Sequence, residues 1–426
     1  MKVAIIGSGG REHAIARAIS NSDKLKKLFI VPGNPGTANL GINIPINPDD
    51  HDKVLEFCKV EQIDLIVIGP EKPLIAGLSD LLVNNGFNVF GPSGDAARIE
   101  GEKSFAKDLM KRFNIPTASY EVFSKEEYDR VLDYLKTIKY PTVVKADGIA
   151  AGKGVVIAEN YNEAVLAVND CFLNYSFGTS GNKIVIEEFM TGQETSIFAI
   201  TDGKEFILLP ASQDHKRIFD GDLGKNTGGM GAFAPVPKVT DELMKVVGDK
   251  IIKPVIDAMN SIGSTYSGCL YCGLMLTNEG PKVVEFNCRF GDPETQVVLP
   301  LLEGDFLQLL MSVSKGKIDK DAVRYNGGAS VCVVVASKGY PDKYLKGIEI
   351  KGIDAVYSNE IIIYHSGTKE VDGKLVTDGG RVFGVTSIIL ENDLIKAKQT
   401  AYQALSKIYF EGMQFRTDIS DKAFRK

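Results

Sequence analysis

A chain of 426 residues, with 44% hydrophobic and 24% charged residues, has the composition of an ordinary globular protein and is long enough for two to four domains. Its formal net charge of −6, without any Lys/Arg run, argues against a nucleic-acid partner. The start, MKVAIIGSGG, reaches glycine too early for a signal-peptide core, and no apolar stretch is long enough to span a bilayer. The six cysteines are scattered, as is typical of reduced thiols, so we expect a cytoplasmic protein without a membrane partner.

The beginning of the chain alternates short β-rich runs with helical patterns. Strands are predicted at 2–7, 27–31, 64–69 and 87–91, and helices between them at 11–21, 52–61 and 75–85. Apolar strands separated by helices indicate a parallel βαβ sheet with helices on both faces. A further helix, with Phe105, Leu109 and Phe113 on its apolar side, ends before Pro116.

The rest of the chain has a different pattern. Strands at 142–148, 154–159 and 183–190 surround a helix at 162–172, and strands at 195–203, 205–211, 269–278 and 282–287 flank a long helix at 241–262. After a break at 325–328, more strands and a closing helix at 393–410 indicate a small α+β module. The predicted class is therefore α/β and α+β multidomain, with domains at 1–101, 102–325 and 326–426 and a subdomain at about 120–190.

A glycine turn joins the first strand to the first helix in VAIIGSGGREHAIARAI. Free N–H groups at a helix N-terminus bind phosphates, so some anion is expected here. A dinucleotide site requires G-x-G-x-x-G and an acidic residue at the end of the second strand, but Glu12 stands at the third glycine position and the second strand ends in FIVPGNPG. A phosphate-bearing substrate fits better, with a turn that serves packing alone as the alternative.

Lysines and glutamates in the middle of the chain have positions suited to an ATP site. Lys145 ends a predicted strand, and Lys153 lies in the small-residue hairpin GIAAGKG, where glycines let backbone amides approach phosphate oxygens. Glu187 and Glu188 end another strand, and Glu194 begins the next. Carboxylates at such a strand end suit an adenine amino group and ribose hydroxyls, and equally suit a solvated turn.

Two other features have less specific interpretations. The glycine-rich segment 211–235 is predicted as a structureless loop, whose length favours a function, while its His215 is expected to make a structural hydrogen bond. Cys269 and Cys272 form a CxxC pair inside an apolar run. Because a zinc site needs four ligands and these two have no companions, a buried strand is the better interpretation.

The stretch VVEFNCRFGDPETQ, residues 283–296, places unusual charge on a strand. With period-two alternation, Glu285, Asn287 and Arg289 share one face. A carboxylate and an amide two residues apart supply hard oxygens suited to Mg²⁺ that bridges phosphates, and an arginine beside them suits a carboxylate or acyl phosphate. An ion-pair ladder is the alternative. The opposite face, expected in the core, carries Val284, Phe286 and Cys288.

The chain resembles the glycinamide ribonucleotide synthetase (phosphoribosylamine–glycine ligase) family of the ATP-grasp superfamily. The resemblance rests on RFGDPETQ (289–296) and continues in order through GSGGREHA, PGNPG, GPE, EGEKSFAK, KADGIAAGKGV, EEFMTGQE, QDHKR, NTGGMGA and DGGRVFGV. It implies a Rossmann-like pre-ATP-grasp N-terminal domain, an ATP-grasp domain whose subdomain at about 120–190 is a mobile lid, and a C-terminal module that closes the site.

The resemblance also implies a reaction in de novo purine biosynthesis. ATP phosphorylates glycine to glycyl phosphate, and 5-phosphoribosylamine displaces phosphate to give glycinamide ribonucleotide and ADP. The implied cofactors are ATP and Mg²⁺ or Mn²⁺, the partners are small molecules alone, and a monomer is expected. Another ATP-grasp carboxylate–amine ligase or carboxylase is the nearest alternative. A nicotinamide-dependent oxidoreductase and a non-catalytic nucleotide-binding module are the others.

Matching the motifs residue by residue assigns roles by similarity. The ATP residues are Lys103, Lys145, Lys153, Glu187, Glu188 and Glu194. The substrate residues are Gly9, Gly10, Arg11, Glu12, Asn34, Gly36, Glu71, Asp214, Asn226 and Arg289, and the metal ligands are Glu285 and Asn287. The catalytic candidates are Arg289, Asp214 and Lys145.

Some positions depart from the wider pattern or receive no firm role. YCGLML (271–276) offers no second metal carboxylate, and Lys72 follows GPE where a small residue is typical. Asp292 and Glu294 lie beyond the alternating strand, so we expect them to brace the turn around Gly291 and Pro293.

Overall fold

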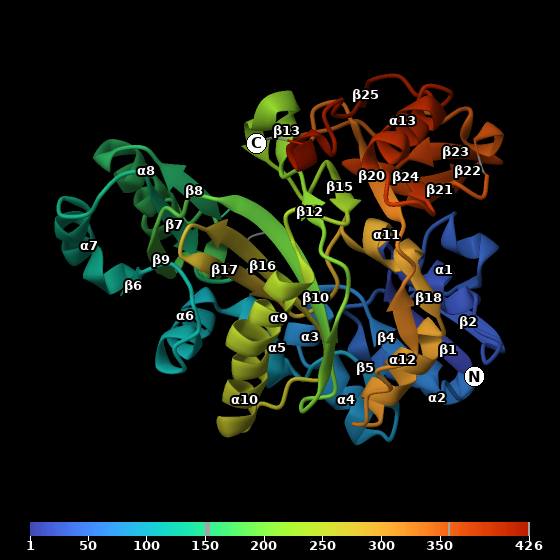
Figure 1. Cartoon of the computed structure of the whole chain (residues 1–426), viewed down its shortest axis with the longest axis horizontal. Coiled ribbons are helices and arrows are strands. Elements are labelled where there is room, and N and C mark those ends of the chain that lie inside the picture. Colours follow the sequence, from blue (N-terminus) through green and yellow to red (C-terminus); the bar gives the residue numbers. More distant parts are fainter. Residues whose placement is uncertain (150–153, 357, 425–426) are drawn as a thin grey trace.

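The computed structural model describes residues 1–149, 154–356 and 358–424. Its N-terminal part is a parallel sheet, as predicted, in the order β3-β2-β1-β4-β5. Figure 1 shows β1, β2, β4 and β5 of this sheet near the N-terminus. The strands are β1 (Lys2–Gly7), β2 (Lys27–Pro32), β3 (Ile42–Asn43), β4 (Leu65–Ile68) and β5 (Asn88–Phe90). The helices are α1 (Gly10–Ser20), α2 (His51–Glu61), α3 (Glu71–Ile75), α4 (Leu78–Asn84) and α5 (Gly94–Gly101).

Alternate residues of β1 enter two different cores. Ala4 and Ile6 pack with α2 to α5, whereas Val3 and Ile5 pack with α1 and α12 (Phe306–Ser314). The helix predicted at 75–85 is interrupted at Gly77, whose φ of +83° separates α3 from α4.

A four-stranded antiparallel sheet forms a separate layer, seen at the left of Figure 1. Its order is β6-β9-β7-β8, and α7 and α8 pack on it around a core of its own that includes Val131, Val144 and Ile186. Helix α6 (Lys103–Arg112) precedes it. The elements are β6 (Tyr120–Ser124), α7 (Tyr128–Leu135), β7 (Thr142–Ala146), β8 (Val155–Ala158), α8 (Tyr161–Phe172) and β9 (Lys183–Glu188). This layer occupies the range predicted for the lid, whose mobility stays a prediction.

The central sheet is antiparallel in the order β11-β10-β16-β17. Its strands are β10 (Gln193–Thr201), β11 (Phe206–Leu208), β16 (Gly268–Thr277) and β17 (Gly280–Asn287). The long predicted helix is α9 (Asp241–Val247) and α10 (Lys253–Ser261) joined by a π-helical turn at Gly248–Ile252. Pro254 lacks an N–H group and crowds the preceding turn, and the wider π turn accommodates it.

A bulge in β17 overturns one prediction from alternation. Gly273 pairs with Glu285 and the next residue, Leu274, pairs with Val283, so Val284 is the extra residue. Val283 is fully buried, whereas Val284 is only half-buried. The assignment of Val284 to the core is therefore wrong, while Phe286 and Cys288 are buried as predicted.

The C-terminal part is built on a sheet in the order β12-β15-β20-β24-β21, with β25 beside β20. Helix α13 (Leu394–Leu405) packs on β20 and β24. The strands are β12 (Gln213–Asp214), β15 (Gly231–Ala234), β20 (Ala329–Ser337), β21 (Ile361–His365), β24 (Arg381–Ile389) and β25 (Met413–Gln414). Smaller elements are α11 (Thr295–Val298) and the pairs β18 (Leu302–Gly304) with β19 (Val323–Tyr325) and β22 (Thr368–Val371) with β23 (Lys374–Thr377).

The prediction of a structureless loop at 211–235 is wrong. The segment contains β12, β15 and the hairpin of β13 (Arg217–Phe219) and β14 (Leu223–Asn226). Gly231 of β15 pairs with Val333 of β20, so the partner that orders this strand is distant in sequence and leaves no local pattern.

All six cysteines are free and buried, and Cys269 and Cys272 on β16 lie in different cores. In the described ranges no helix combines the length and apolarity needed to cross a membrane.

Candidate active site

The Glu285 carboxylate lies among lysines from three parts of the chain. Burial opposes its ionisation, but Lys216, Lys145 and Lys103 outweigh burial and hold the pKa of Glu285 below its ordinary value. It is thus kept in the charged form that a metal ligand needs. Gly273 stands opposite Glu285, and among the described residues no three His, Cys, Asp or Glu side chains gather into a metal cluster. Glu285 and the Asn287 amide are the pair predicted to bind Mg²⁺, and that role stays a prediction.

Glu187 on β9 pairs with two buried lysines, Lys145 on the neighbouring strand β7 and Lys107 on α6. Its Oε1 lies 2.9 Å from Lys145 Nζ, and its Oε2 lies 3.0 Å from Lys107 Nζ. Lys145 Nζ also donates to the carbonyl of the bulge residue Val284 at 3.3 Å. Burial lowers the pKa of Lys107 to about 8, against the effect of Glu187. Both Glu187 oxygens therefore face lysines.

Lys107 was not singled out from the sequence, although its spacing from Lys103 places both lysines on the same side of a helix. It lies four residues after Lys103 on α6, within the EGEKSFAK motif. Lys103 Nζ donates to the carbonyl of Gly148 at 2.9 Å, at the start of the predicted glycine hairpin. Burial lowers the pKa of Lys103, with Glu285 acting against it. Lys153, the predicted lid lysine, lies outside the described residues.

Two other predicted ATP residues lie at the edges of this cluster. Glu188 is exposed, and its Oε1 accepts a hydrogen bond from the Ser119 amide at 3.1 Å. Glu194 Oε2 lies 3.2 Å from Lys216 Nζ. Lys216, which the sequence did not single out, is held charged because Glu194, Asp214 and Glu285 outweigh burial and raise its pKa.

Asp214 and His215 are adjacent and both buried, but carboxylates lie near Asp214 and cationic side chains lie near His215. Burial, with Glu294 and Glu194 nearby, raises the pKa of Asp214, while Lys216 acts against this. The predicted structural hydrogen bond of His215 is wrong: neither ring nitrogen has a partner among the described residues, and the ring lies 6.0 Å from that of Phe233. Burial lowers the pKa of His215 to about 3.

Asn226 lies apart from these carboxylates, at the end of β14. It lines a crevice of about 400 Å³ with Val156 on the lid strand β8 and Pro341 in the C-terminal part. Lys225, beside it, pairs with Asp342 at 2.8 Å. The structure therefore places this predicted substrate residue where the β6-β9-β7-β8 sheet and the C-terminal part meet.

Arg289 is fixed by two carboxylates from the N-terminal part. Its Nε lies 3.3 Å from Glu71 Oε2, and its Nη2 lies 2.8 Å from Glu100 Oε1. Nη1 donates to the Phe290 carbonyl at 3.3 Å. A guanidinium has five N–H groups, so donors remain for a ligand. Glu100 opens the EGEKSFAK motif, yet nothing in its position alone marked it.

Glu12 fills the space beneath the N-terminal glycine turn. Its carboxylate accepts hydrogen bonds from Gly9 N and Arg11 Nε, both at 2.6 Å. A Cβ at Gly7, whose φ is +127°, would lie 2.5 Å from Glu12 Cγ, so this position requires glycine. A Cβ at Gly69 would lie 2.0 Å from Glu12 Oε1 and would displace the carboxylate. This carboxylate occupies the place that the dinucleotide motif keeps empty, which agrees with the argument against an NAD site.

Asn34 and Gly36 tie the second-strand loop to the C-terminal part. Asn34 Nδ2 donates to the carbonyls of Ser8 at 2.8 Å and His365 at 3.0 Å, and its Oδ1 accepts from Gly36 N at 2.9 Å. A Cβ at Gly36 would lie 2.3 Å from the His13 ring. A substrate role for these residues, and for Gly10 and Arg11, stays a prediction.

Asp292 links three parts of the molecule. It accepts hydrogen bonds from Arg11 N at 3.4 Å and Gln296 Nε2 at 2.8 Å, and it lies 3.3 Å from Arg381 Nη1. Glu294 Oε1 accepts from the Tyr271 hydroxyl at 3.0 Å. Both carboxylates have protein partners around the turn, as the bracing role requires.

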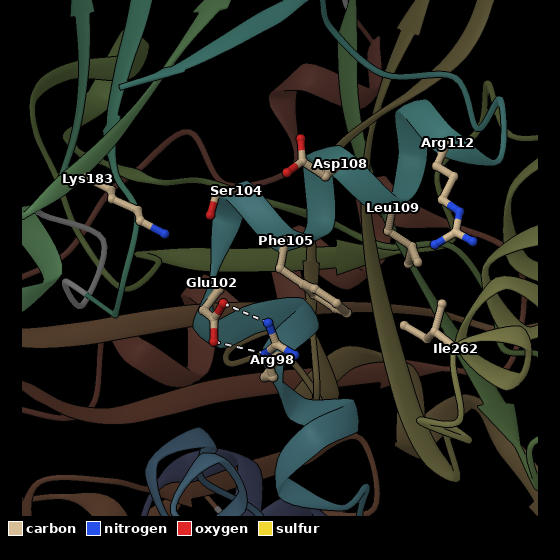
Figure 2. Close-up of a pocket in the computed structure, with 9 residues that line it drawn as sticks. All are labelled: Arg98, Glu102, Ser104, Phe105, Asp108, Leu109, Arg112, Lys183 and Ile262. Atoms are coloured by element: carbon tan, nitrogen blue, oxygen red, sulfur yellow. Dashed lines mark hydrogen bonds and ion pairs between the residues drawn. The ribbon is translucent and has the colours of Figure 1, made fainter. Parts of the chain in front are cut away.

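A second crevice, of about 320 Å³, lies beside α5 and α6 (Figure 2). Arg98 and Glu102, four residues apart, pair on its wall at 2.9 Å, and Phe105, Arg112 and Lys183 also line it. It contains none of the predicted site residues, so we assign the site to the charged face of β17.

Family models match almost the whole chain. They are described as the N domain, the ATP-grasp (A) domain and the C domain of phosphoribosylglycinamide synthetase, and they match residues 1–100, 101–295 and 330–422. The chain belongs to the phosphoribosylglycinamide synthetase family.

Individual relatives support this membership. The phosphoribosylamine–glycine ligase of Caldanaerobacter subterraneus is 44% identical over 99% of both chains. The crystal structure of the ligase of the same name from Thermotoga maritima superposes with a TM-score of 0.85 at 36% identity, covering 98% of this chain and 100% of that one. The biotin carboxylase domain of a Hydrogenobacter thermophilus 2-oxoglutarate carboxylase shares the fold, with a TM-score of 0.75 at 17% identity, covering 97% of this chain and 91% of that one.

Proposed function

We propose that this chain joins 5-phosphoribosylamine and glycine to give glycinamide ribonucleotide, ADP and phosphate, as an early step of purine biosynthesis. The observation that carries the proposal is 44% identity to a phosphoribosylamine–glycine ligase over 99% of both chains. The charged face of β17 supports it, because a carboxylate kept ionised among lysines suits a reaction on a phosphate chain.

The chemistry requires activation of glycine before the amide can form. A carboxylate is inert to amines because its leaving group would be oxide. A glycine carboxylate oxygen attacks the γ-phosphorus of ATP, the bond to the bridging oxygen breaks, and ADP leaves. The amine of phosphoribosylamine then attacks the carbonyl carbon of glycyl phosphate, the bond from that carbon to the phosphate oxygen breaks, and the nitrogen loses a proton.

The residues of the site suit these steps. Lys103 and Lys145 supply fixed positive charge for the phosphates, and Arg289 has N–H groups left to hold the glycine carboxylate. When bound by Glu285 and Asn287, Mg²⁺ or Mn²⁺ supplies further charge beside the phosphate oxygens. Asp214, whose pKa burial raises, is our candidate to receive the proton of the amine.

An activity assay tests the function. We expect the purified protein to release ADP and phosphate when glycine, phosphoribosylamine, ATP and Mg²⁺ are all present, and to stop when any one is omitted. Bicarbonate is the control acid, because a biotin carboxylase domain has the same fold. Turnover with bicarbonate but not with glycine would contradict the proposal. We place the activity in the cytoplasm. We also expect a monomer, and sedimentation of the purified protein can check this oligomeric state.

A further inference from the structure

Glu100 lies behind the charged face of β17 and contacts three consecutive residues of that strand and the turn after it. It is on α5, in the N-terminal part, and its side chain is 9% exposed. Its Oε2 accepts a hydrogen bond from the Cys288 amide at 2.7 Å, and its Oε1 accepts from Arg289 Nη2 at 2.8 Å.

Glu100 also determines which way the Asn287 amide faces, because only the orientation with the amide nitrogen toward Glu100 satisfies both ends of the amide. With its nitrogen toward acceptors, Asn287 donates to Glu100 Oε1 at 3.1 Å and to the Phe286 carbonyl at 3.2 Å. The amide oxygen is then turned away from Glu100. An amide binds a cation through its oxygen, so a carboxylate that holds the nitrogen selects the orientation in which Asn287 serves as a metal ligand.

We propose that Glu100 is a positioning residue, which orients Asn287 toward the metal and anchors Arg289 for the acid substrate. The inference rests on the proposed function for the identity of that acid. Glu100 itself touches neither metal nor substrate: it holds two side chains that are expected to do so. Because one carboxylate serves both, a change at Glu100 affects metal binding and glycine binding together.

Glu100→Gln is the sharpest variant, because it keeps the size of the side chain. A glutamine has one oxygen, so it cannot accept on one side from Cys288 and on the other from both Asn287 and Arg289. Removing an outer partner of a metal ligand commonly weakens metal binding or activity about 10- to 100-fold. We expect Mn²⁺ binding in the presence of ADP, followed by the electron paramagnetic resonance of free Mn²⁺, to weaken about tenfold, and the KM for glycine to rise in parallel.

Two further variants separate positioning from folding. Glu102→Gln, two residues along the chain, removes the exposed pair with Arg98 (Figure 2) and should leave Mn²⁺ binding unchanged. Glu100→Asp keeps the charge but shortens the side chain, so it should bind Mn²⁺ with an affinity between wild type and Glu100→Gln. It also carries the test if the glutamine variant fails to fold. A purely structural role would lower the unfolding temperature and leave the Mn²⁺ affinity unchanged.

The outcomes that overturn the inference are distinct from those that overturn the function. Mn²⁺ affinity and glycine KM within twofold of wild type in Glu100→Gln would overturn the positioning role. Failure of the wild-type protein to bind Mn²⁺ with ADP would overturn it as well. Failure to use glycine, with Mn²⁺ binding weakened in Glu100→Gln, would overturn the proposed function and leave Glu100 as the residue that orients Asn287.

Discussion

Glu285 is the residue whose substitution tests the metal site most directly. Glu285→Gln keeps the shape of the side chain and removes its charge. The lysines around it retain other partners, since Lys145 pairs with Glu187 and Lys216 pairs with Glu194. We therefore expect turnover to fall more than about a hundredfold, while the free energy of unfolding changes by about 1 kcal/mol or less. Steady-state kinetics and urea unfolding measure the two effects.

The matched control is Glu279→Gln in the β16–β17 hairpin. Glu279 pairs with Lys282 at 2.7 Å, and its side chain is 76% exposed, so its loss should leave both turnover and stability near wild type. Wild-type kinetics in Glu285→Gln would remove the metal role from this face of β17.

The site residues that the sequence predicted have positions set by local alternation along a strand. The residues that were missed have positions set by contacts with distant segments or by a bulge. Glu285 and Asn287 share a strand, so period-two alternation was enough to place them on one face. Glu100 was missed because its role comes from packing of α5 against β17, a contact between distant segments. Val284 was misplaced because a bulge shifts the pairing by one residue, and no residue type in VVEF specifies a bulge.

At the scale of elements, the segment after β25 fixes the β13–β14 hairpin. The Arg416 side chain is completely buried. Its Nε and Nη2 donate to the two oxygens of Asp418, each at 2.7 Å, and its Nη1 donates to the Arg217 carbonyl at 3.0 Å. The Thr417 amide adds a bond to Asp220 Oδ1 at 2.8 Å. These contacts order the hairpin that leads from Lys216 to Asn226.

Removing Arg416 should therefore loosen that hairpin. Arg416→Ala removes a completely buried guanidinium and leaves the Asp418 carboxylate, whose side chain is 14% exposed, without its bidentate partner. Breaking a buried ion pair typically costs about 3–5 kcal/mol. We expect a lower unfolding midpoint in urea and faster amide hydrogen exchange across 217–226. Arg324→Ala is the control, because Arg324 is 82% exposed and its pair with Glu303 should contribute about 1 kcal/mol or less. Exchange unchanged in Arg416→Ala would show that the hairpin is ordered without this segment.

Elements with local signals were predictable, and those that depend on distant partners were not. In the N-terminal part, apolar runs predict the strands and amphipathic periodicity predicts the helices. Strands β12 and β15 are short, lie among glycines and exist because β20 pairs with β15 from far along the chain. The sheet therefore crosses the predicted division at 325–326, which the break at YNGG suggested.

At the scale of the whole molecule, buried histidines lie where its parts meet. His13 on α1 accepts a hydrogen bond from the His365 amide on β21 at 3.0 Å, across the N-terminal and C-terminal parts. Burial lowers the pKa of His13 to about 3 and that of His365 to about 4. His215, with a pKa lowered to about 3 by burial, lies near Lys422 and Arg416 of the C-terminal segment.

This arrangement makes the folded molecule sensitive to mild acid. An unfolded histidine binds a proton below about pH 6.5, whereas these folded histidines do so only near pH 3 to 4, so the unfolded chain takes up more protons as the pH falls from 7 to 5. Each histidine should thereby cost about 2 kcal/mol of stability over that interval. His215→Leu removes one such group without breaking a hydrogen bond to a described residue. We expect its loss of stability between pH 7 and pH 5, measured by urea unfolding, to be about 2 kcal/mol smaller than that of the wild type. Carboxylates common to both proteins cancel in this difference. Equal losses in the two proteins would mean that the folded chain protonates His215 as readily as the unfolded chain does.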